Sequence, residues 1–177
     1  MRLLANPRPF MGLTPSPSQL QAHAAPSAAE EQAWLERART LQRAALAGRT
    51  QLLLRGKNVG LLCDDDTLPA AVLFRGAASE LGAHVAHIGM SLSELSPAQE
   101  VAHTARMLGR LYDAVECQGL ASALVRQIAD LSGIPIYDGM ALNAAQLTRL
   151  ALLLGPESAL GDNRRVALQA LLLHTIV

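Results

Sequence analysis

The sequence predicts an α/β fold in three layers, with helices on both faces of a four-stranded parallel sheet. Two observations lead to this prediction. From Lys57 onward, short apolar runs alternate with longer segments of helical periodicity, a pattern typical of βαβ units whose strands pair in parallel. In addition, half of the 177 residues are apolar, which is enough for a substantial core in one domain.

The N-terminal part predicts a partly flexible segment followed by a helix. Residues 1–27 are rich in Pro, Ser and Ala, which is typical of poorly ordered chain. Ser27 is a suitable N-cap for a helix over Ala28–Ala47, and Gly48 suits its end. The apolar stripe of this helix is expected to consist of Trp34, Ala38, Leu41 and Ala45.

The remainder of the chain supplies the strands and the helices that connect them. Strands are expected at Asn58–Cys63, Ala83–Ile88, Asp113–Cys117 and Ile134–Tyr137. Helices are expected at Pro69–Leu81 and Pro97–Leu108, over a segment with Leu120, Leu124, Ile128 and Leu131 on one side that ends at Gly133, and at Leu142–Leu154.

A last helix is expected to begin with Asp162 as its cap and to run to about Ile176. It is apolar nearly all round, so it must be buried on more than one side. Residues 28–177 are interpreted as a single domain that includes this helix over 162–176.

Composition excludes several classes of function. The 15 Lys and Arg residues equal the 15 Asp and Glu residues, and aromatic residues make up 3%, so a nucleic-acid binder is not expected. No apolar stretch is long enough to cross a bilayer, and Met1–Leu13 does not resemble a signal peptide. Two cysteines make no disulfide framework, so we expect a cytoplasmic protein without a membrane partner.

Ligands of parallel α/β sheets bind beyond the carboxyl ends of the strands. The first such loop carries Asp64, Asp65, Asp66 and Thr67 before a helix with Pro69 near its start. One interpretation is helix capping by Asp66 or Thr67, which we favour by roughly four to one over a Mg²⁺ or Ca²⁺ site because the three acids lack a ligand spacing. In either case the carboxylates repel phosphate, by about 1–4 kcal/mol for each contact near 4 Å.

Other reactive residue types have simpler interpretations. His84 and His87 lie three apart on one strand and point to opposite faces, which disfavours a shared metal ion. Cys63 and Cys117 are interpreted as small buried apolar residues, with a metal or redox pair as the minority alternative. His103, Arg106 and Arg110 share a helix, and a solvated or interface face is expected there, with an anion site as the alternative that no Gly-rich cradle supports.

Four ordered segments carry a resemblance to a known family. They are RGKNVGLL at 55–62, ELGAHVAHI at 80–88, TARMLGRLYDAVECQG at 104–119 and GIPIYDGM at 133–140. Together they resemble the carbamoyl-phosphate-binding domain of the aspartate/ornithine carbamoyltransferase family, and ornithine carbamoyltransferase in particular. The resemblance spans about a hundred residues at near-family spacing.

The resemblance implies where the phosphate contacts of the family would fall. The family's Ser-x-Arg-Thr-Arg loop aligns with residues 67–71, where Thr67 keeps a hydroxyl but Pro69 and Ala70 replace an arginine and a threonine. The arginine that reaches the carbamoyl oxygen aligns with Gln118, and the His-Pro-x-Gln motif aligns with residues 143–146, of which Asn143 and Gln146 could still form hydrogen bonds. Each lost guanidinium removes about 1.5–3 kcal/mol of charge-assisted contact.

The resemblance also implies an altered domain organisation and function. DNRRVALQALLL at 162–173 resembles the family's terminal helix, so the family's second, amino-acid-binding domain is expected to be absent between 155 and 161. Because family members form trimers through this domain, we expect a homotrimer without catalytic residues or a cofactor, acting by binding or assembly in amino-acid metabolism. Its partner would be an unknown small molecule or a true carbamoyltransferase. The alternatives are residual carbamoyl transfer, metal-assisted chemistry at the acidic loop, and a decayed remnant held only by its fold.

Overall fold

The computed structural model describes residues 27–49, 51–89, 91–140 and 144–177. These residues form six helices and four strands, which alternate from the first strand to the fifth helix. Their bounds are α1 Ala28–Leu46, β1 Asn58–Leu62, α2 Pro69–Glu80, β2 His84–Ile88, α3 Ala98–Leu111, β3 Ala114–Cys117, α4 Ser122–Ser132, β4 Ile136–Asp138, α5 Ala144–Leu153 and α6 Leu160–Ile176.

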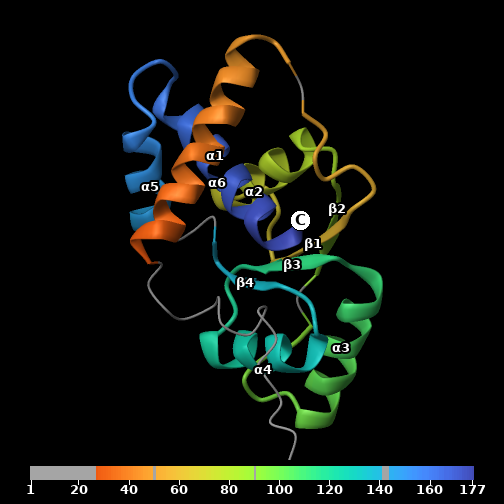
Figure 1. The fold of residues 1–177 in the computed structure, drawn as a ribbon. Helices are drawn as coiled ribbons and strands as arrows, with labels where there is room; N and C mark the ends of the chain where they lie inside the picture. The colour runs from red at the N-terminus through yellow and green to blue at the C-terminus, as the bar shows by residue number, and fades with distance from the viewer. Residues whose placement is uncertain (1–26, 50, 90, 141–143) are drawn as a thin grey trace, which may run out of the picture.

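The four strands form one parallel sheet in the order β2-β1-β3-β4. The register pairs Leu62 of β1 with both Ile88 of β2 and Cys117 of β3, and Cys117 in turn with Asp138 of β4. The carboxyl ends of all four strands therefore meet at one edge of the sheet. Figure 1 shows the sheet between two groups of helices, which confirms the predicted three layers.

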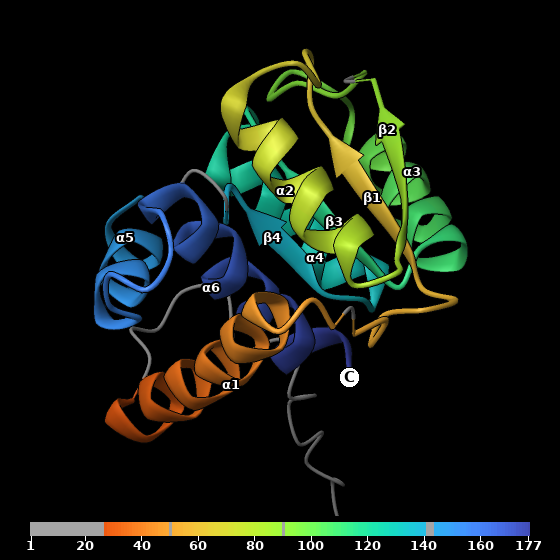
Figure 2. The same cartoon turned by 90° about the horizontal axis from the view of Figure 1, so that it is seen from above.

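Each face of the sheet has its own half of the core (Figure 2). On one face, α1, α2, α5 and α6 contribute a cluster that includes Phe74, Leu168 and Leu172. On the other face, α3 and α4 contribute Leu108 and Ile128. Strand residues alternate between the two clusters, as the pleat of a strand requires.

Helix α6 is the centre of the first group of helices. It packs against α1, α2 and α5, and every residue from Val166 to Leu173 is buried. Its buried polar side chains have partners: Asn163 donates to the carbonyls of Ala151 and Gly155, and it accepts from Gln42. Burial on more than one side is confirmed for this apolar helix.

The helix ends depart from the expectations in several details. Ser27 caps α1 in a full capping box with Glu30, as predicted. The buried face of α1 consists of Leu35, Ala38, Leu41, Gln42 and Ala44. Half-buried Trp34 packs against the same core cluster, as predicted, whereas Ala45 is exposed and was wrongly assigned to the stripe.

Further corrections concern later helices. Asp162 is not a cap, because α6 begins at Leu160 with Ala159 as its N-cap and Asp162 lies in the first turn. Leu120 precedes α4, and Leu131 is exposed on it. The expected start of α5 at Leu142 and most of the flexible segment 1–27 lie outside the described residues. In the part of the chain that the structure describes, no helix is long and apolar enough to cross a membrane.

Candidate functional site

The candidate site lies at the carboxyl edge of the sheet, where the loops after β1, β3 and β4 come together. Strand register places Cys117 between Leu62 and Asp138. Gln118 follows β3 directly, and its backbone N–H donates to the Leu62 carbonyl at 2.9 Å. The acidic loop, defined as residues 64–67, is thereby adjacent to Gln118 as expected of neighbouring parallel strands.

Side chains of the acidic loop turn to different partners. Asp65 accepts from the backbone N–H and the hydroxyl of Thr67, at 2.8 and 2.6 Å. Asp66 forms an ion pair with Arg75 of α2. The N-cap of α2 is Leu68, with Pro69 in the first turn, and no side chain caps this helix. Capping by Asp66 or Thr67 was therefore the wrong prediction, because the acids are held by Thr67 and Arg75 instead.

The loop is anionic at neutral pH. The Thr67 hydroxyl and N–H hold the pKa of the Asp65 carboxyl below its usual range. Burial, together with the negative charges of Asp66, Asp65 and Asp64, raises the pKa of the Cys63 thiol that precedes them. Cys63 is thus a neutral buried thiol, and the carboxylates give the loop its charge.

The geometry of the acidic loop gives no support to the cation alternative. Asp65 and Asp66 point their oxygens at Thr67 and Arg75, and no three His, Cys, Asp or Glu side chains in the described ranges gather as metal ligands would. A Mg²⁺ or Ca²⁺ site needs several oxygen ligands around one point.

The Gln118 side chain points toward a buried acid, Glu116. This glutamine is 6% exposed, and its amide donates to Glu116 Oε1 at 3.2 Å. Glu116 is fully buried in β3, and its other oxygen accepts from the Met140 N–H at 3.1 Å. The bond between Glu116 and Met140 links β3 to the segment that follows β4. A second link is the Gly139 N–H, which donates to the Cys117 carbonyl at 2.9 Å.

The remaining predicted site residues are less informative. Pro69 is exposed and Ala70 half-buried at the start of α2, so neither supplies a polar group to the loop. Gln146 is half-buried on α5, whereas Asn143 lies outside the described residues.

The histidines and cysteines follow their simpler interpretations. His84 and His87 are both exposed, and the His87 ring nitrogen lies 2.9 Å from the Cys63 carbonyl. Cys63 and Cys117 are buried and free. Burial raises the pKa of Cys117 to about 12, which makes it an unreactive thiol.

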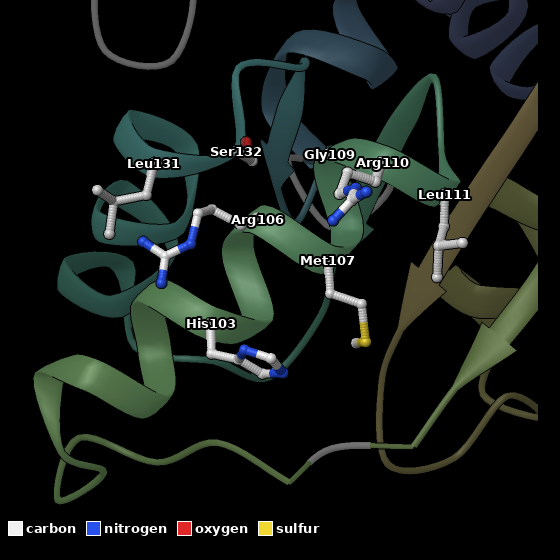
Figure 3. A pocket seen from close by; sticks show the side chains of 8 residues that line it. All are labelled: His103, Arg106, Met107, Gly109, Arg110, Leu111, Leu131 and Ser132. Carbon is white, nitrogen blue, oxygen red and sulfur yellow. The ribbon is translucent and has the colours of Figure 1, made fainter.

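A concave region lies away from this edge, between α3 and α4 (Figure 3). It has a volume of about 780 Å³, and its lining includes His103 and the two guanidinium side chains of Arg106 and Arg110. The sequence placed these three on one helix but gave no sign of the groove, which we call the α3–α4 groove.

Two residues of the candidate site were missed from the sequence. Arg75 neutralises part of the acidic loop from nine residues further along the chain. Glu116 could have been noticed, because an acid inside an apolar strand is costly unless it is hydrogen-bonded.

Comparison with known families and proteins agrees with this geometry. A family described as "Aspartate/ornithine carbamoyltransferase, carbamoyl-P binding domain" matches residues 20–146. The ornithine carbamoyltransferase of Actinobacillus pleuropneumoniae serotype 5b is 36% identical over 106 residues, which cover 60% of this chain and 32% of that protein. The catabolic ornithine carbamoyltransferase of Mycoplasma capricolum subsp. capripneumoniae is 39% identical over 106 residues, which cover 60% of this chain and 34% of that protein. The chain thus spans about a third of the length of these relatives.

Solved structures share the fold. The ornithine carbamoyltransferase from Pyrococcus furiosus superposes with a TM-score of 0.57 at 26% identity, covering 64% of this chain and 36% of that one. The aspartate transcarbamoylase from Trypanosoma cruzi in complex with phosphate superposes with a TM-score of 0.60 at 21% identity, covering 70% and 41%. The second likeness concerns the fold alone.

Proposed function

This chain belongs to the aspartate/ornithine carbamoyltransferase family through its carbamoyl-phosphate binding domain, and we propose that it is a non-catalytic member that acts by binding or assembly. The observation that carries the proposal is the acidic loop. Its acids, Asp64–Asp66, directly precede residues 67–71, to which the resemblance assigns phosphate binding, at the carboxyl edge of the sheet beside the start of α2.

Charge is the first argument against a phosphate ligand there. Asp64 and Asp65 are exposed, and the lowered pKa of Asp65 keeps that carboxyl ionised at neutral pH. Arg75 is the cation bonded to this loop, and it is engaged with Asp66. A phosphate bound at residues 67–71 would therefore lie next to carboxylates and without the guanidinium groups of the family, and like charges repel it.

Loss of donors is the second argument. Pro69 has no backbone N–H and Ala70 has no side-chain donor. Gln118, at the position of the family's carbamoyl-binding arginine, donates its amide to Glu116. A carbamoyl oxygen would thus have to compete with a buried carboxylate for that donor.

Calorimetric titration of the full chain with carbamoyl phosphate tests the proposal. We expect no binding up to millimolar ligand, with an active ornithine carbamoyltransferase as the positive control. Millimolar or tighter binding would contradict the proposal and favour residual carbamoyl transfer. The matched variant Asp64→Asn/Asp65→Asn separates the two arguments: heat of binding in this variant alone assigns the exclusion to charge.

The assembly part of the proposal is that the chain forms a homotrimer in the cytoplasm, in the context of amino-acid metabolism. Trimer formation through this domain in the family is the support for it, together with exposed apolar side chains such as Leu111 and Leu131. Light scattering on the full chain checks this part, because a folded monomer at all concentrations would instead favour a remnant held only by its fold.

A further inference from the structure

The α3–α4 groove gathers hydrogen-bond donors on a concave surface. Arg106 and Arg110 lie four residues apart on α3, which places both side chains on the same side of the helix. His103 lies one turn before Arg106, and its ring can add an N–H donor. None of the eight described residues that line the groove is acidic. Such a lining suits an oxyanion, because guanidinium groups bind carboxylates and phosphates through paired N–H donors.

Apolar side chains form much of the remaining lining. Met107, Leu111 and Leu131 are 42%, 56% and 45% exposed. Figure 3 shows the Arg106 side chain on the side of α3 where Leu131 of α4 lies. A molecule held by the arginines would therefore also cover apolar surface, and removal of that surface from water favours binding.

Concavity, more than exposure, makes these arginines a candidate site. Arg37 and Arg39 on α1 are exposed as well, and an exposed arginine alone predicts no ligand. Arg106 and Arg110 line a groove of about 780 Å³ together with apolar side chains. This volume lies in the range of about 300–1,000 Å³ that is typical of small-molecule sites, which combine an apolar lining with a few polar groups.

The base of the groove is set by close packing of the two helices. A Cβ atom at Gly109 would lie 2.0 Å from the Ser132 carbonyl oxygen, so α3 and α4 approach each other at the backbone. Leu108 and Ile128 are fully buried on the inner sides of these helices. Because the backbone of the groove is already in place, binding there requires little ordering of the chain, and this lowers its cost.

The helix ends determine how a ligand would be oriented. Both α3 and α4 end at the groove, and the last carbonyl groups of a helix carry partial negative charge. They do not bind an oxyanion, so the charged head must lie against the side chains of Arg106 and Arg110. The apolar part of the ligand then lies against Met107 and Leu131.

We propose that the α3–α4 groove binds a small amphipathic oxyanion, a molecule with a carboxylate or phosphate head and a short apolar body. The inference rests on the proposed function, because it names a site and a ligand class for a family member that acts by binding. The site is separate from the acidic loop, which lies at the carboxyl edge of the sheet.

NMR titration of the full, isotope-labelled chain with octanoate, below its micellar concentration, tests the proposal. We expect saturable amide shifts that are largest in residues 103–111 and 131–132. Acetate keeps the carboxylate without the apolar body, and octyl glucoside keeps the apolar chain without the charge, so each should bind much more weakly than octanoate. Octyl phosphate in place of octanoate distinguishes a phosphate head from a carboxylate head.

Variants locate the binding. Arg106→Gln/Arg110→Gln should weaken octanoate binding about tenfold or more, because the charge-assisted hydrogen bonds to the head are lost. Leu131→Ser should also weaken it, through the loss of apolar contact. Arg37→Gln/Arg39→Gln is the matched control, since it removes two exposed charges from α1 and should leave the affinity unchanged. Spectra of the unliganded variants establish that each is folded.

Three results would overturn the site. They are the absence of binding by both octanoate and octyl phosphate, shifts that spread over the surface without saturation, and an affinity that the arginine variant and its control change equally. None of these results bears on carbamoyl phosphate. Failure of the groove is therefore distinguishable from failure of the non-catalytic proposal, which calorimetry decides.

Discussion

At Gly109, helix α3 passes so close to the end of α4 that no side chain fits. A Cβ atom at this position would lie 2.0 Å from the Ser132 carbonyl oxygen, and a backbone atom cannot move aside as the tip of a side chain can. Gly109→Ala should therefore lower the free energy of unfolding by about 1–3 kcal/mol, as overpacking does. Urea unfolding measures the change.

Gly76 on α2 provides the control, because a Cβ there meets nothing within 4 Å. Gly76→Ala should raise the free energy of unfolding by about 0.5–1 kcal/mol through the better helix propensity of alanine. If both substitutions had the same sign, the close approach at Gly109 would not be the cause.

Asp113 gives a pH dependence with a definite sign. The Asn58 N–H at 2.8 Å and the Lys57 ammonium at 3.1 Å hold the pKa of its carboxyl below the usual value. A depressed pKa contributes stability above the unfolded pKa of about 3.9, and this is lost as pH falls through the folded value. Asp113→Ala should thus cost about 1 kcal/mol at pH 7.

The difference between Asp113→Ala and the wild type should shrink as the pH falls below about 4, because the wild-type carboxyl becomes protonated. Chemical unfolding at a series of pH values measures it. A difference that stayed constant down to low pH would assign the effect of Asp113 to packing. Asp113→Asn, which keeps an acceptor for the Asn58 N–H, should lose less at neutral pH.

The positions of the site residues could be predicted from the sequence, but their partners could not. Asp64–Asp66 and Gln118 follow strands, and a parallel sheet gathers the carboxyl ends of its strands at one edge. The capping prediction failed because Arg75 and Thr67 supply donors to Asp66 and Asp65. Such choices depend on how α2 is placed on the sheet, which local sequence does not determine.

Among the elements, α6 should be the most sensitive to truncation of its side chains. Leu168 is fully buried in it, next to a helix on each side, whereas Leu152 at the end of α5 is 66% exposed. Leu168→Ala should lower the free energy of unfolding by about 2–5 kcal/mol through lost burial and a cavity. Leu152→Ala should change it by less than about 0.5 kcal/mol, and equal effects in thermal or urea unfolding would contradict the central position of α6.

Element order followed from the sequence because the apolar periods change cleanly between strands and helices. The strand order β2-β1-β3-β4 is compatible with that alternation but is not specified by it. The prediction of which residues are buried failed where tertiary contacts determine burial. Gln42 is buried on α1 because it donates to Asn163 of α6, a contact between residues far apart in the sequence. The burial of α6 could be predicted because a helix that is apolar nearly all round must be buried, whichever elements cover it.

On the scale of the whole molecule, the two half-cores share one sheet, so they should unfold together. Trp34, the only tryptophan, lies at the α1–α6 contact with its ring centroid 5.7 Å from that of His174, and its fluorescence reports on that face. Leu108 is fully buried on α3 on the opposite face. Leu108→Ala should cost about 2–5 kcal/mol and, for a two-state domain, shift the unfolding midpoint of Trp34 fluorescence as far as that of far-UV circular dichroism. A fluorescence midpoint that stayed at its wild-type value would mean that the helices around α6 unfold independently of α3 and α4.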